Sequence, residues 1–81
     1  MTIMLKDGRR MQGTALQIVG EMRSLNPGWA GSVRAYVEYV VDQAEQFEGA
    51  QLRVTGTTDE EQAASLVNEM LLAGLAERVR L

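Results

Sequence analysis

Cysteine and histidine are both missing from this chain of 81 residues. Disulfide bonds, thiol nucleophiles and zinc fingers are therefore excluded, and so are the catalytic triads that need an imidazole base. Transition-metal sites mostly use imidazole or thiolate ligands, so we expect no metal and no cofactor. Because these are the parts that most catalytic mechanisms require, the sequence predicts a protein that is not an enzyme.

Long apolar runs and an excess of positive charge are also missing. No run approaches the roughly 20 apolar residues that span a bilayer, and residues 1–8 are too short and interrupted for a signal peptide. The net charge of −3 argues against nucleic-acid binding by the molecule as a whole. We therefore expect a cytoplasmic protein without a membrane partner, folded as a single compact domain over residues 1–81.

The small size of the chain favours association. A domain of this length buries only roughly 60–65% of the surface that its unfolded chain exposes. Small cores without disulfides often gain stability by binding another chain. The composition therefore predicts a homo-oligomer or a complex with a protein partner.

A short pattern occurs twice along the sequence. Residues 10–14 read Arg-Met-Gln-Gly-Thr and residues 53–57 read Arg-Val-Thr-Gly-Thr, and an amphipathic stretch follows each copy. Each copy predicts a strand, a Gly-Thr junction and a helix. We interpret both junctions as ordinary helix caps. Of the two, Gly13-Thr14 is the better candidate for an anion site, because Arg9 and Arg10 lie near it, whereas acidic residues 59–61 follow the second copy directly.

Residues 2–12 predict a β-hairpin whose register depends on its turn. A two-residue Asp-Gly loop would split the apolar residues between both faces. A three-residue loop over residues 6–8 pairs Ile3 with Met11 and Leu5 with Arg9, which keeps the apolar side chains together. We expect the second register.

Three helices follow from apolar spacing and capping residues. The expected N-caps are Thr14, Ser32 and Thr58, and Gln17 and Glu61 complete capping boxes for the first and third helices. The expected ends are Ser24, Gly49 and Gly74. The second helix has a long apolar stripe that we expect to be buried, formed by Val33, Tyr36, Val37, Val40, Val41, Ala44 and Phe47.

Residues 51–55 alternate between polar and apolar side chains and predict a third strand. Residues 75–81 predict a fourth, with Val79 and Leu81 inward and Arg78 and Arg80 outward. The fold class is therefore α+β, in the order β-β-α-α-β-α-β, with a four-stranded mixed sheet and three helices packed on one face. A right-handed crossover should make the last two strands parallel, with the strand at residues 10–12 running opposite to them.

The candidate binding surface is the open face of this sheet, where the strand pattern places Arg10, Arg53, Arg78 and Arg80. Arginine binds carboxylate or phosphate through paired hydrogen bonds, so these side chains predict docking to a protein partner or self-association. The alternative is a small regulator that contacts nucleic-acid backbone through the same face, although no aromatic residue lies on a predicted strand. Trp29, between the first two helices, is a further candidate contact residue or a lid on the core.

Overall fold

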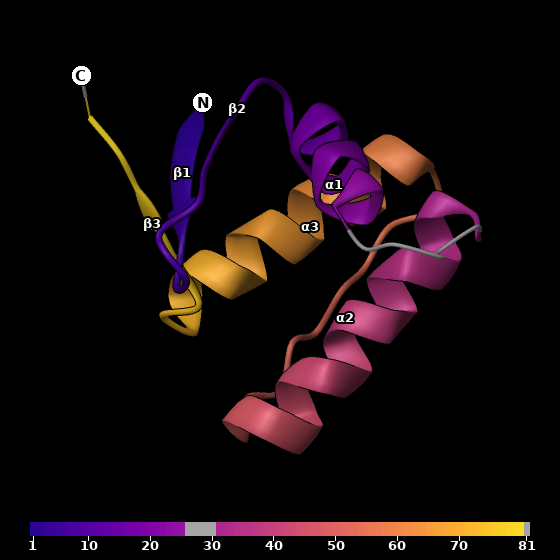
Figure 1. Ribbon diagram of the computed structural model, residues 1–81. Helices are drawn as coiled ribbons and strands as arrows, with labels where there is room; N and C mark the ends of the chain where they lie inside the picture. Colours follow the sequence, from indigo (N-terminus) through magenta and orange to yellow (C-terminus); the bar gives the residue numbers. More distant parts are fainter. Residues whose placement is uncertain (26–30, 81) are drawn as a thin grey trace.

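The computed structural model describes residues 1–25 and 31–80 and has the expected α+β class (Figure 1). The described residues form three strands rather than four. In chain order the elements are β1 (Thr2–Leu5), β2 (Arg10–Gln12), α1 (Ala15–Ser24), α2 (Val33–Glu48), α3 (Asp59–Leu72) and β3 (Ala76–Arg78).

The first two strands form the expected hairpin. Ile3 pairs with Met11, and the N–H of Leu5 donates to the carbonyl of Arg9 at 2.8 Å. The turn closes where the N–H of Gly8 donates to the carbonyl of Leu5 at 2.9 Å, with Gly8 at a φ of 92° that glycine adopts easily. The register that keeps the apolar side chains together is therefore confirmed.

The prediction of a strand at residues 51–55 is wrong. The segment is extended, but the backbone N–H groups of Arg53 and Thr55 donate to side chains of α3, at Glu69 Oε1 (2.9 Å) and Ser65 Oγ (3.0 Å). Its alternation arises because Leu52 is buried against the helices, not because the segment pairs within a sheet. The expected parallel pair and its crossover are absent from the described residues for the same reason.

The sheet has the order β2-β1-β3, with both neighbours antiparallel to β1. β2 and β3 therefore run in the same direction, whereas the sequence predicted opposite directions. In the last strand, Arg78 and Arg80 are exposed as expected, but the pairing differs from a regular alternation with Val79 inward, because Ala76 is buried opposite Leu5 and Arg78 pairs with Ile3. Val79 is half-buried just beyond the strand, and Leu81 lies outside the described residues.

The helix starts agree closely with the sequence. Thr14 and Thr58 are N-caps with complete capping boxes, and Ser32 accepts from the N–H of Ala35. Gly49 ends α2 in the left-handed conformation with a φ of 64°. α3 ends at Leu72 with Ala73 as its C-cap, and Gly74 follows in the left-handed conformation with a φ of 77°, so its predicted role as the terminating residue is confirmed.

The core lies between the sheet and the helices. α1 packs against α3 and β2, and α3 packs against β3, while α2 packs against α1 and α3 (Figure 1). The sequence predicted that all three helices pack on one face of the sheet. In the structure α2 packs on the other two helices instead of on the sheet. The most deeply buried large side chains are Ile3, Ile18, Leu66, Val19, Val37 and Val67.

Candidate functional site

The structure does not bring the four candidate arginines onto one sheet face. Arg10 pairs with Met4, so it lies on the face opposite to Ile3. Arg78 pairs with Ile3 itself and therefore belongs to the other row of side chains. The shared arginine face is thus wrong as a geometric prediction, because strand pairing alternates the faces.

The other two arginines lie away from any strand. Arg53 is on the extended segment beside α3, and Arg80 follows the end of β3. All four arginines are exposed, and their part in binding a partner remains a prediction. Trp29 lies outside the described residues.

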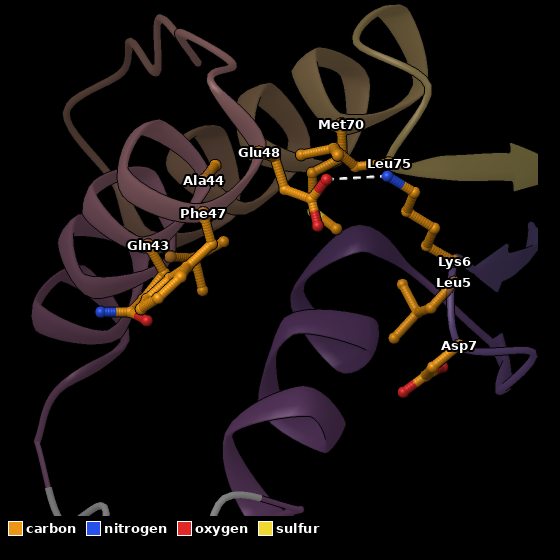
Figure 2. Close-up of a pocket in the computed structure, with 10 residues that line it drawn as sticks. Leu5, Lys6, Asp7, Gln43, Ala44, Phe47, Glu48, Met70 and Leu75 are labelled. Atoms are coloured by element: carbon orange, nitrogen blue, oxygen red, sulfur yellow. Dashed lines mark hydrogen bonds and ion pairs between the residues drawn. The ribbon is translucent and has the colours of Figure 1, made fainter.

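An open apolar pocket lies where the hairpin turn, the end of α2 and the end of α3 meet (Figure 2). Its volume is about 300 Å³. We call it the Phe47 pocket, and its lining residues are Leu5, Lys6, Asp7, Val40, Gln43, Ala44, Phe47, Glu48, Met70 and Leu75.

Phe47 is 73% exposed at this pocket, which corrects the prediction that it is buried with the rest of its helix stripe. Ala44, one turn earlier, is the last buried residue of α2. Figure 1 shows the final turn of α2 extending away from α1, on the side where Glu48 reaches Lys6 of the hairpin turn. The apolar stripe of α2 therefore continues after α1 has ended as a packing partner. An aromatic side chain is thereby left beside a hollow with apolar walls.

The two walls of the Phe47 pocket carry opposite charge. The hairpin wall includes Lys6, and the helix wall ends in Glu48; Lys6 Nζ lies 2.7 Å from Glu48 Oε2 across the rim (Figure 2). Both side chains remain substantially exposed, at 63% and 39%. Because the pair is exposed, it stabilises the fold little. For the same reason, both groups are accessible to a neighbouring molecule.

The charges behind each wall extend this contrast. α2 contains four acidic residues and one basic residue, Arg34, which lies at its far end 3.7 Å from Asp59. The hairpin turn and its flanks carry Lys6, Arg9 and Arg10 against one acid, Asp7. The pocket therefore lies between an acidic helix and a basic turn.

The repeated Gly-Thr junctions are occupied by the chain's own side chains. At the first junction, the N–H of Thr14 donates to Gln17 Oε1 at 2.8 Å and the N–H of Gln17 donates to Thr14 Oγ1 at 3.1 Å. These contacts use the free N–H groups that an anion would need. The interpretation of this junction as a helix cap is confirmed.

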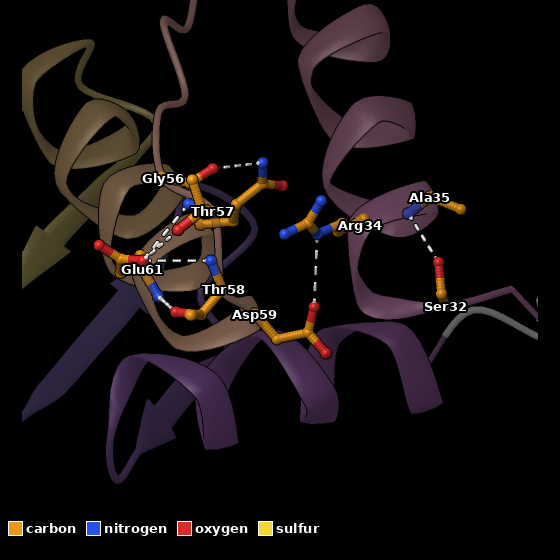
Figure 3. A network of polar contacts seen from close by, with 9 residues as sticks. Ser32, Arg34, Ala35, Gly56, Thr57, Thr58, Asp59 and Glu61 are labelled. Atoms are coloured by element: carbon orange, nitrogen blue, oxygen red, sulfur yellow. Dashed lines mark hydrogen bonds and ion pairs between the residues drawn. The ribbon is translucent and has the colours of Figure 1, made fainter.

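The second junction uses a carboxylate in the same way (Figure 3). Glu61 Oε1 accepts from the hydroxyl of Thr57 at 3.0 Å, from the N–H of Thr58 at 3.1 Å and from the N–H of Thr57 at 3.3 Å. The hydroxyl bond from Thr57 and the backbone bonds favour the ionised form and lower the pKa of Glu61. The junction is therefore filled by a negative charge and is not arranged to receive another.

Within residues 1–25 and 31–80, no three acidic side chains come together in a way that could hold a metal ion. No helix in these ranges combines the length and the apolar character that crossing a membrane requires.

Comparison of the chain with protein-family models, with curated proteins and with solved structures found no significant match. Any functional assignment therefore depends on the geometry of the site itself. Sequence reasoning did not find the Phe47 pocket, because Leu5 lies at the end of β1, Phe47 in the last turn of α2 and Leu75 between α3 and β3. The available signal was the position of Phe47 in the last turn of its helix, where the packing partner can end before the apolar stripe does.

Proposed function

We propose that this chain is a non-enzymatic interaction module that binds a protein partner, or a second copy of itself, through the Phe47 pocket. The observation that carries the proposal is the 73% exposure of Phe47 directly beside an open apolar hollow. Aromatic side chains next to pockets are typical anchors of protein interfaces. Complete burial of such a side chain contributes about 1.5–3 kcal/mol.

The pocket has the mixed character of a protein-binding surface. Leu5, Val40 and Leu75 supply apolar walls, and the Lys6–Glu48 pair lies at the rim. Interfaces commonly combine an apolar centre with a polar edge. We infer that the main contact surface is this pocket and not the four arginines. A cytoplasmic location remains the prediction from the composition.

Photo-crosslinking from the pocket tests the proposal. A photoreactive phenylalanine analogue at position 47 should give discrete protein adducts in a lysate of the native host. The matched control places the same analogue at Glu60, an exposed position at the opposite end of α3 from the pocket. Absence of adducts from position 47, or the same adducts from both positions, would contradict the proposal.

The alternative function, contact with nucleic-acid backbone, still depends on Arg10, Arg53, Arg78 and Arg80. Their spread over separate surfaces supports it less than a single basic face would. Titration of the purified protein with random DNA and RNA at low salt separates the two functions, because backbone contacts are strongest there. Measurable binding that a fourfold arginine variant loses would favour the alternative.

A further inference from the structure

We infer that the occupant of the Phe47 pocket is a second copy of this chain, bound through a two-fold axis. The inference rests on the proposed function and names its partner. One surface of the molecule carries both a projecting aromatic side chain, Phe47, and the apolar hollow formed around Leu5, Val40 and Leu75. A two-fold axis through this surface places Phe47 of each copy over the hollow of the other.

Charge complementarity selects this occupant. Lys6 gives the hairpin wall its positive charge, since the other charged residue there, Asp7, is paired with Arg9 at 3.3 Å. Glu48 gives the helix wall its negative charge. A two-fold axis between the walls exchanges them, so the acidic wall of each copy faces the basic wall of the other. Both contacts are then favourable at the same time, which complementary surfaces require. A second copy provides the reversed charge arrangement without any further adaptation.

The Lys6–Glu48 pair fits such an interface. Within one chain the two groups already lie 2.7 Å apart at the rim. In the dimer, two lysines and two carboxylates would form an alternating cluster around the buried aromatic rings. The apolar contact then supplies affinity, and the charged rim fixes the register of the two copies.

Complementary charge variants test the inference with purified protein. In Lys6→Glu both walls are acidic, and in Glu48→Lys both walls are basic, so each variant alone should dimerise roughly tenfold more weakly than the original chain. An equimolar mixture should recover dimers, because the acidic turn of the first variant then meets the basic helix of the second. Sedimentation over a range of concentrations measures all three samples.

An apolar variant gives an independent result. Phe47→Ser should abolish the dimer while leaving the melting temperature of the monomer unchanged. Leu72→Ser is the matched control, because Leu72 is equally exposed, at 75%, but does not line the pocket. Loss of the dimer in both variants alike would overturn the assignment to this pocket.

The outcomes separate this inference from the proposed function. If the original chain is a monomer at every concentration and position 47 crosslinks to a different protein, the inference of a dimer is contradicted. The proposed function as an interaction module is then still supported. A monomer without any crosslinked partner would overturn both. Dimers in the mixture of charge variants but not in either variant alone would support both.

Discussion

The backbone N–H of Arg53 donates a hydrogen bond to the carboxylate of Glu69 at 2.9 Å. Ser65, one turn earlier on α3, accepts from the N–H of Thr55 in the same way at 3.0 Å. Side chains of a helix thus take the place that a neighbouring strand would have along this extended segment. The segment stays attached to α3 and out of the sheet.

Glu69→Ala should lower the free energy of unfolding by about 1 kcal/mol, because the Arg53 N–H loses its acceptor. Glu69→Gln keeps an acceptor oxygen and should cost less. Urea denaturation measures both, with Asn68→Ala as a control at the adjacent exposed position. Hydrogen exchange at the Arg53 amide should accelerate in Glu69→Ala; an unchanged rate there would show that the contact does not hold the segment.

Alanine at the two junction glycines should destabilise the protein by different amounts. Gly56 has a φ of 122°, and an added Cβ would lie 2.6 Å from the Cβ of Glu61 and 3.0 Å from its backbone carbon. Gly13 has a φ of 132°, but the closest atom there is the flexible end of Gln17. We expect a loss of about 1–3 kcal/mol for each from backbone strain, larger for Gly56→Ala.

Gly20→Ala is the matched control for these variants. Gly20 lies within α1, and an added Cβ meets nothing within 4 Å. Alanine there should stabilise the protein by about 0.5–1 kcal/mol, since glycine is unfavourable inside a helix. Thermal melting of the three variants gives the order, and equal effects at Gly13 and Gly20 would contradict the strain argument.

Stability should depend on pH through Glu61. Its pKa is lowered in the folded protein, chiefly by the hydroxyl of Thr57 and the N–H of Thr58. A lowered folded-state pKa contributes stability that is present above the unfolded-state pKa and is lost as the pH falls through the folded-state value. The contribution is therefore complete at neutral pH and disappears in acid.

Melting temperatures of the original chain and of Glu61→Gln, measured from pH 7 to acid, check this dependence. The original chain should be the more stable at pH 7, and the difference should shrink as Glu61 becomes protonated. Asp42→Asn serves as the control, because Asp42 accepts only from Gln46 on the exposed face of α2 among the described contacts. A difference for Glu61→Gln that stays constant with pH would contradict the role of the ionised carboxylate.

Phe47→Ala and Leu66→Ala should differ sharply in their effect on stability. Leu66 is fully buried, so its truncation should cost about 2–5 kcal/mol. Phe47 is mostly exposed, and its truncation should change the free energy of unfolding by less than about 0.5 kcal/mol at monomer concentrations. Denaturation in dilute solution makes the comparison, and a large loss for Phe47→Ala would show that its ring belongs to the core.

Local chemistry explains which parts of the fold were predictable. The caps at Thr14, Ser32 and Thr58 depend on side chains within a few residues of each other, and the sequence displays those residues directly. The hairpin register was equally accessible, because only one register puts Ile3 and Met11 on the same face. In each case the decisive contact lies within a short stretch of chain.

The remaining errors come from contacts between distant residues. Alternation at Leu52 predicts a strand, yet the acceptors on α3 decide where its backbone bonds go. The phase of β3 depends on how Ala76 meets Leu5, which no local pattern contains. The errors at the candidate site have the same origin. The shared arginine face depended on the predicted strands, and the predicted burial of Phe47 depended on helix periodicity alone.

The central place of β1 in the sheet has a consequence for how the protein is made. β1 is synthesised before β3, yet one of its two edges pairs only with β3, which follows all three helices in the chain. The hydrogen bond from the N–H of Val79 to the carbonyl of Thr2, at 3.0 Å, can also form only after β3 has been made. Until then β1 presents an unpaired edge that can join another nascent chain. Synthesis of β3 therefore covers an edge through which the chain could otherwise aggregate.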